Sequence, residues 1–434
     1  MITFIRFLLF GLSTLGFWEF LRHHTSFHLR FYPVLTIAIQ SCLLQLAGLL
    51  NILLETACFL WGLGFAGFLW YTIREKADNL KCYFQMEVFF LVIVMLVLFF
   101  CVRDRLFTHY DNFSHWALVV KSMLRTNRFP NFESIISFRS YPLGSSVFVY
   151  FTAKLIGQTE PIQMLGQAYM MIACILPLFP SERRRPMFSL FLLLIAVNFF
   201  LSYNIQPTEL LTDTLLPLAG MGALLFACYC KKPSRQESLF MMFFLIWVVQ
   251  IKAAGIFFVL PAVGVYLLHT KKNRNLRDGL ACIGIVLFSL FLWARHYQYV
   301  FPSLSLSQHS ISISWWKNAL ASKSLEDIKH IAIEIVKKAF SWDYFGFWMV
   351  MLVCTLLIGL LFSGRSKLYL AKHLLISLSL YLAYQAGLFL KYVFSMSRTE
   401  AFYLICFDRY EKSLSFTDGM MSGLPSLIIN GCQN

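Results

Sequence analysis

Charged residues are scarce in this sequence. Only 14% of its 434 residues are Asp, Glu, Lys or Arg, whereas 58% are hydrophobic and 45 are phenylalanine. Soluble domains carry about 25% charged residues. The mean hydropathy of +0.66 points the same way. This composition excludes an ordinary soluble protein and predicts a polytopic membrane protein.

Several sequence motifs are absent as well. The chain has no Walker A motif, no GxSxG, no HExxH and no internal repeat, which excludes a soluble-type nucleotide enzyme. Its 11 cysteines form no CxxC pair, and most, such as Cys42 and Cys174, lie inside apolar runs. We interpret them as buried, reduced thiols rather than disulfides or metal ligands.

Apolar runs of about 17 to 22 residues recur along the chain, and each can cross a hydrocarbon core of about 30 Å as a helix. We predict an all-α transmembrane bundle of about twelve spans, with an extracytoplasmic loop that carries surface helices. The predicted spans are residues 3–20, 31–50, 52–73, 86–102, 162–180, 187–203, 210–229, 238–250, 254–269, 279–296, 345–363 and 373–391. A single membrane domain over residues 1–412 would be followed by a loose tail over residues 413–434.

Basic residues in the short loops predict the orientation. The net charge of +15 reflects Lys and Arg between apolar runs, which indicates membrane topology rather than a nucleic-acid partner. Placing all the basic loops in the cytoplasm requires residues 238–269 to form a hairpin that turns at Lys252. The loops 103–161 and 297–344 then lie on the extracytoplasmic side of the cell membrane. Residues 142–157 must dip into the bilayer without crossing it.

Residues 103–157 form the longest polar interruption, and we expect any chemistry to occur there. The run that begins HYDNFSHW predicts an amphipathic helix on the membrane surface, with Asp111 and His115 together on its polar face. Asp111 fits either a catalytic carboxylate or a helix N-cap, and His115 fits either a catalytic or an ordinary surface histidine. Arg103 is adjacent to Asp104, and one interpretation is that the two form a local ion pair and nothing more.

Two later positions carry unusual charges. Glu209 and Asp213 stand four residues apart at the start of an apolar run, where carboxylates are rare unless they serve a function or favour a helix N-terminus. Lys252 at the hairpin turn would reach the same face as the 103–161 loop, and a compact cation there suits phosphate.

This layout resembles the GT-C superfamily of polytopic glycosyltransferases, which includes protein O-mannosyltransferases, aminoarabinose transferases and oligosaccharyltransferase catalytic subunits. Members carry an essential acid in their first large extracytoplasmic loop, followed by an aromatic-Pro-Pro-like segment. Asp111 and the Tyr-Pro-Leu-Gly segment that starts at Tyr141 stand in corresponding places, as do Asp213 and the Lys252 turn. The segments DNFSHW and MSRTEAFYLICFDRY are similar to uncharacterised membrane proteins of Gram-positive bacteria associated with cell-surface polysaccharide assembly.

The resemblance implies transfer of a sugar from a polyprenyl-phosphate carrier to an extracytoplasmic glycan, lipid or protein acceptor. In that role Asp111 would be the base and His115 would orient Asp111 or bind the acceptor. Residues implied in binding the substrate or its phosphate are Arg103, Arg139, Tyr141, Asp213 and Lys252. Some superfamily members use a divalent metal ion and others do not, so a metal at Asp213 stays open. The implied partners are the lipid-linked donor and membrane lipids, without nucleic acid and with an open oligomeric state.

Two rival interpretations remain. A permease or flippase for a lipid-linked polysaccharide precursor has the same hydropathy, but it predicts polar residues along the spans rather than at one face. An inactive, truncated membrane protein is the other alternative, because the chain stops soon after FDRY.

Overall fold

The computed structural model describes residues 1–74, 86–178, 209–302, 313–346, 348–350, 352–353 and 367–411. This part of the chain is all-helical and contains no strand, so the all-α prediction is confirmed for it. The predicted span 187–203, most of the predicted span 345–363 and the predicted tail 413–434 lie outside the described residues.

The chain divides into two compact units. Unit 1 comprises Met1–Ser137 and Pro142–His296, and unit 2 comprises Phe138–Tyr141 and Tyr297–Asn434. The single membrane domain over residues 1–412 stays a prediction.

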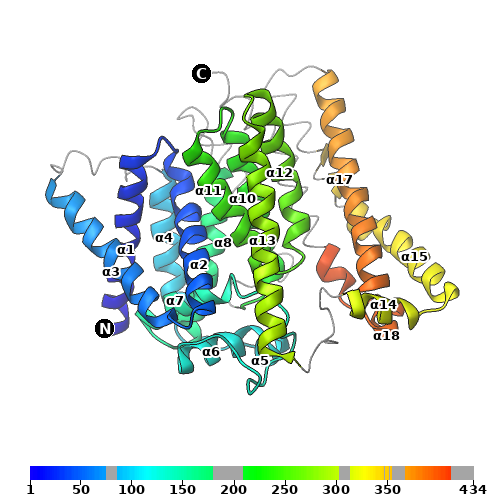
Figure 1. Cartoon of the computed structure of the whole chain (residues 1–434), viewed down its shortest axis with the longest axis horizontal. Coiled ribbons are helices and arrows are strands. Elements are labelled where there is room, and N and C mark those ends of the chain that lie inside the picture. Colours follow the sequence, from blue (N-terminus) through cyan, green and yellow to red (C-terminus); the bar gives the residue numbers. More distant parts are fainter. Residues whose placement is uncertain are drawn as a thin grey trace. The chain divides into compact units, whose positions relative to one another are not determined.

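Unit 1 is a bundle of upright helices with three shorter helices near one end (Figure 1). Its elements are α1 (Ile2–His24), η1 (Leu29–Phe31), α2 (Tyr32–Leu49), α3 (Leu53–Arg74), α4 (Met86–Cys101), α5 (Tyr110–Ser114), α6 (Trp116–Thr126), α7 (Ser146–Ile156), α8 (Glu160–Ile175), η3 (Leu176–Leu178), α10 (Thr212–Tyr229), α11 (Arg235–Ile251), α12 (Gly255–Lys272) and α13 (Leu276–Val300), whose last turn belongs to unit 2.

Five helical stretches among the described residues are long and apolar enough to cross a membrane. They are Ile2–His24, Leu29–Leu49, Leu53–Arg74, Thr212–Tyr229 and Leu276–Val300. In α3 and α13 only 22% of the apolar window is buried within the protein, so most of each apolar helix faces outward. Such faces are stable in lipid but not in water, which indicates a membrane protein. The count of twelve spans stays a prediction.

The ends of the unit 1 helices fall into two groups. At one end the Tyr229 hydroxyl donates to the Ser26 carbonyl (2.9 Å), and the Asn273 amide donates to the Lys231 carbonyl (2.7 Å). At the other end α5 and α6 lie across the lower ends of the upright helices in Figure 1. The basic segments 231–235 and 271–277 therefore lie at the end opposite α5 and α6.

The predicted helical hairpin is present, because α11 and α12 are separated by the turn at Lys252. Two glycines allow the close packing of this turn. The Gly255 N–H donates to the Lys252 carbonyl (2.7 Å), and a Cβ on Gly255 would lie 2.4 Å from the Val248 carbonyl oxygen. Gly144, the last residue of the Tyr-Pro-Leu-Gly segment, donates its N–H to the Gln250 carbonyl (2.6 Å), so it places the start of α7 against the last turn of α11.

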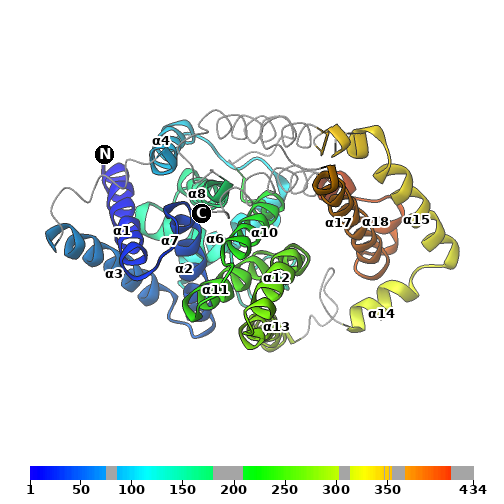
Figure 2. The ribbon, with the colours of Figure 1, turned by 90° about the horizontal axis from the view of Figure 1, so that it is seen from above.

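Helix α7 is the predicted non-crossing segment. It has 11 residues, which corresponds to about 16 Å of helix and cannot span a core of about 30 Å. It packs against α1, α2, α6 and α8 (Figure 2). Val147, Phe148 and Tyr150 are fully buried, so α7 is a core element of unit 1.

The predicted amphipathic helix is wrong in two respects. It is broken into α5 and α6 at His115, whose φ of −146° and ψ of −76° are not helical. Asp111 and His115 are only 5% and 1% exposed instead of facing solvent. The break arises from residue Ser137, whose N–H donates to the Ser114 carbonyl (2.9 Å) and whose carbonyl accepts from His115 Nδ1 (2.8 Å).

Unit 2 contains α14 (Ile313–Ala321), α15 (Leu325–Ala339), η5 (Trp342–Gly346), α17 (Lys367–Phe394) and α18 (Arg398–Phe402). Lys323 is buried and donates to the carbonyls of Ala319, Val393 and Met396. Asp327 accepts two hydrogen bonds from the Arg398 guanidinium. These contacts fasten the α14–α15 connection to the end of α17 and the start of α18.

We predict that Gly144→Ala destabilises the protein by about 1–3 kcal/mol, because overpacking against rigid backbone costs that much. The added Cβ would lie 2.6 Å from the Gln250 carbonyl carbon and oxygen. In the matched control Gly264→Ala, the new Cβ meets nothing within 4 Å, and helix propensity favours alanine by about 1 kcal/mol. Thermal unfolding in detergent measures both variants. Equal effects of the two substitutions would contradict the packing of Gly144 on α11.

Candidate functional site

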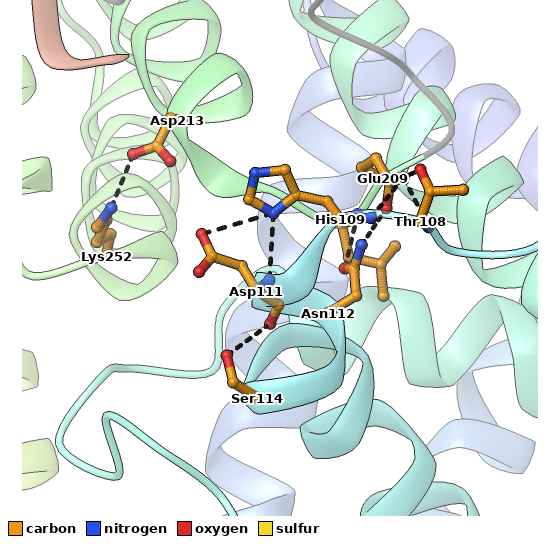
Figure 3. A network of polar contacts seen from close by, with 9 residues as sticks. Thr108, His109, Asp111, Asn112, Ser114, Glu209, Asp213 and Lys252 are labelled. Carbon is orange, nitrogen blue, oxygen red and sulfur yellow. Dashed lines mark hydrogen bonds and ion pairs between the residues drawn. The ribbon is translucent and has the colours of Figure 1, made fainter. Parts of the chain in front are cut away.

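A buried carboxylate holds the turn that precedes α5. Glu209 Oε1 accepts hydrogen bonds from the Thr108 N–H (3.0 Å), the Thr108 hydroxyl (2.5 Å) and the His109 N–H (3.1 Å). Glu209 Oε2 accepts from the Asn112 amide, and Asn112 Oδ1 accepts in return from the Leu210 N–H (3.2 Å). We call this set, Thr108, His109, Asn112 and Glu209, the Glu209 latch (Figure 3).

The latch fixes the start of α5 and so positions Asp111. His109 is the N-cap of α5, and its Nδ1 accepts from the Asp111 N–H (3.2 Å). Asp111 is therefore not the N-cap. Because Nδ1 accepts this bond it carries no proton, and its 3.9 Å approach to the Asp111 carboxylate is not an ion pair in that state. Figure 3 shows the Asp111 carboxylate pointing away from Glu209, toward the side on which Asp213 and Lys252 lie.

Asp213 and Lys252 form an ion pair between two helix ends. Lys252 Nζ lies 2.8 Å from Asp213 Oδ1, and the two side chains are 7% and 12% exposed. Asp213 stands in the first turn of α10, and Lys252 is the residue that follows α11 in an extended conformation. Each charge therefore lies at the helix end whose dipole favours it. Breaking such a buried pair leaves the remaining charge uncompensated.

His115 connects Asp111 with this ion pair. Burial lowers its pKa from 6.5 to about 4; the hydrogen bond to Ser137 raises the pKa, the charge of Lys252 lowers it and the charge of Asp111 raises it. The charges of Lys252 and Asp111 thus both act on this imidazole, and Figure 3 shows the Asp111 carboxylate on the side of Lys252 and Asp213. Since Nδ1 donates to a carbonyl, the neutral ring presents an unprotonated Nε2. We call Asp111, His115, Asp213 and Lys252 the polar cluster.

Arg103, Arg139 and Tyr141 are the remaining predicted site residues. Arg103 is exposed beyond the end of α4, and no contact among the described residues brings it to the polar cluster. Arg139 and Tyr141 belong to unit 2, where the Arg139 guanidinium lies 5.5 Å from the Phe301 ring centroid and Tyr141 stacks on Phe138 (5.3 Å). Their predicted roles in binding substrate stay predictions.

Sequence reasoning missed the latch. It singled out Glu209 only as a neighbour of Asp213 with four-residue spacing, and it gave Thr108 and Asn112 no role. Glu209 precedes α10, which begins at Thr212, so the two carboxylates do not share a helical face. The available signal was a carboxylate beside an apolar run, whose burial requires hydrogen-bond donors.

A metal centre is not preformed in the part of the chain that the structure describes. No group of three or more His, Cys, Asp or Glu residues there could hold an ion. A divalent ion at Asp213 stays a prediction.

In comparisons with known proteins, no protein-family model, no curated protein and no solved structure matches this chain. The polar cluster and the latch therefore carry the functional argument.

We predict that His115 makes the stability of the protein depend on pH. Its pKa is about 4 in the folded protein and 6.5 as the ordinary value, so between these pH values the unfolded chain binds a proton that the folded protein does not. The free energy of unfolding should fall by about 3 kcal/mol as the pH drops from 6.5 to 4. Above pH 6.5, this dependence on pH should vanish. His115→Asn keeps a donor for Ser137 and should flatten that part of the profile, measured by unfolding at pH 5 and pH 8. An unchanged profile would contradict a buried, neutral His115.

Proposed function

We propose that this chain is a membrane glycosyltransferase of GT-C-like architecture that moves a sugar from a polyprenyl-phosphate carrier to an extracytoplasmic acceptor. One observation carries the proposal: a buried carboxylate, Asp111, points toward the side on which the Asp213–Lys252 ion pair lies, at one end of an apolar bundle. A base and a cation are the two groups that such a transfer requires.

In the proposed reaction the acceptor oxygen forms a bond to the anomeric carbon of the sugar as the bond from that carbon to the phosphate oxygen breaks. The acceptor proton passes to the Asp111 carboxylate, and the electron pair leaves with the phosphate. Lys252 offsets the charge that develops on the leaving group. His115 stays neutral because it is buried, so its Nε2 can accept a hydrogen bond from a second hydroxyl of the acceptor and orient the acceptor.

The charges of the cluster set a further requirement. Two carboxylates, Asp111 and Asp213, face one ammonium, Lys252, so a neutral His115 leaves one negative charge in excess. A phosphate would be repelled unless another cation accompanies it. A divalent metal ion would supply that charge, and Asp213 would be the residue to hold it or a sugar hydroxyl.

The topology of unit 1 supports an extracytoplasmic site. The basic segments 231–235 and 271–277 lie at the end opposite α5 and α6, and basic loops favour the cytoplasm. On this proposal the polar cluster faces outward in a bundle of about twelve spans. A permease would require polar side chains along a path through the bundle, whereas the charges of unit 1 described here concentrate at its ends.

The decisive variant is Asp111→Asn, which removes the base with little change in shape. We expect glycosyl transfer to fall by at least about a hundredfold, the usual contribution of a general base. Asp104→Asn is the matched control, since Asp104 is an exposed carboxylate in the same loop. Surface-glycan composition, measured in the native host lacking the gene and complemented with each variant, reports the activity. Full complementation by Asp111→Asn, with the variant correctly inserted, would contradict the catalytic role.

A further inference from the structure

Unit 1 contains an apolar cavity that the proposed chemistry does not use. It lies between α1, α4, α7 and α8 and has a volume of about 260 Å³. Its lining includes Leu8, Gly11, Val92, Met95 and Leu165. Nearly all of the lining is hydrocarbon, so water or a polar metabolite would find few hydrogen-bond partners there.

The cavity opens on the lipid-facing surface between α1 and α4. Leu8 and Val92 are 45% and 47% exposed, whereas Met95 and Leu165 form the buried wall. The lining residues of α1 run from Phe7 to Trp18, the middle of a helix that is long and apolar enough to span the membrane. The opening therefore lies at the depth of the bilayer hydrocarbon.

Four phenylalanines pack together beside the first turns of α1, and one of them, Phe7, lines the cavity. Phe7 lines the cavity and packs on Phe99 (4.8 Å between ring centroids), and Phe4 contacts Phe99 (5.5 Å) and Phe100 (5.9 Å). These rings connect the first turns of α1 with the last turn of α4. They continue the apolar surface from the cavity toward the membrane interface.

Exposed arginines follow immediately. Arg103 comes seven residues after Leu96 of the cavity lining, about 10 Å along the helix direction. Arg6, Arg103 and Arg105 are all exposed, and no carboxylate among the described residues forms an ion pair with any of them. Asp104 is the single acid in this group, so the patch is positive overall. Arg103 and Arg105 follow the end of α4, and Arg6 lies in the second turn of α1, whose Phe4 contacts Phe99 and Phe100 of α4.

We propose that unit 1 binds one anionic glycerophospholipid, with an acyl chain in the cavity and the phosphate at Arg6, Arg103 and Arg105. The dry, lipid-facing cavity selects the acyl chain, and the charge of the arginines selects the head group. This proposal does not rest on the glycosyltransferase proposal, because none of the polar cluster residues takes part.

Filling the cavity tests the acyl-chain site. The variant is Gly11→Leu, because Gly11 lines the cavity and a Cβ there meets nothing within 4 Å. Gly284→Leu is the matched control, since Gly284 is an exposed glycine in α13 with equally open surroundings. Native mass spectrometry of the delipidated full chain, titrated with phosphatidylglycerol and phosphatidylcholine of identical chains, measures binding. We expect the wild type to retain one phosphatidylglycerol. Its binding should weaken at least about tenfold in Gly11→Leu and stay unchanged in Gly284→Leu.

Charge removal tests the head group. Each of Arg6→Gln, Arg103→Gln and Arg105→Gln should lower the preference for phosphatidylglycerol over phosphatidylcholine by about fivefold. Val92→Phe is a second cavity-filling variant if Gly11→Leu does not fold. Unchanged retention in a folded cavity-filling variant would overturn the proposal. Displacement of phosphatidylglycerol by an equimolar polyprenyl phosphate, with both lost in Gly11→Leu, would overturn the phospholipid as occupant and identify a polyprenyl site.

Discussion

The burial of the Glu209 carboxylate is the constraint on which the polar end of unit 1 depends. A carboxylate beside an apolar helix is costly unless its oxygens accept hydrogen bonds. Glu209 obtains them from two backbone N–H groups, the Thr108 hydroxyl and the Asn112 amide. Satisfying Glu209 therefore fixes the turn before α5, and that turn determines where Asp111 lies.

Local packing then assembles the rest of the cluster. Gly144 brings the start of α7 against the last turn of α11, next to the Lys252 turn, and Gly255 lets α12 begin directly after it. Lys252 meets Asp213 because both stand at helix ends that favour their charge. The outcome is a carboxylate, a neutral imidazole and an ion pair at one end of unit 1, and none of these residues lines the apolar cavity between α1 and α4. Chemistry and lipid binding would thus use different parts of one unit.

The sequence predicted which helices form better than it predicted which side chains these helices bury. Placing all the basic loops on one side required a hairpin that turns at Lys252, which α11 and α12 form, and required residues 142–157 not to cross, which agrees with the short helix α7. Helical spacing predicted an exposed polar face for Asp111 and His115 and failed, because Ser137, 22 residues away, breaks the helix at His115. The role of Glu209 could not be predicted, since its partners lie 97 to 101 residues earlier. Such contacts leave no periodic signal. The GT-C resemblance and the roles of Arg139 and Tyr141 stay predictions.

The central structural claim is that Glu209 holds the turn that positions Asp111. Hydrogen–deuterium exchange of the backbone amides of Thr108 and His109, in wild type and Glu209→Gln, tests it most directly. Hydrogen bonds to a charged acceptor contribute about 1.5–3 kcal/mol and those to a neutral one about 0.5–1.5 kcal/mol, so removing the charge should speed exchange by about fivefold to tenfold at these two amides. Amides in the middle of α11 should exchange as in wild type. Equal exchange of Thr108 and His109 in the two proteins would contradict the account.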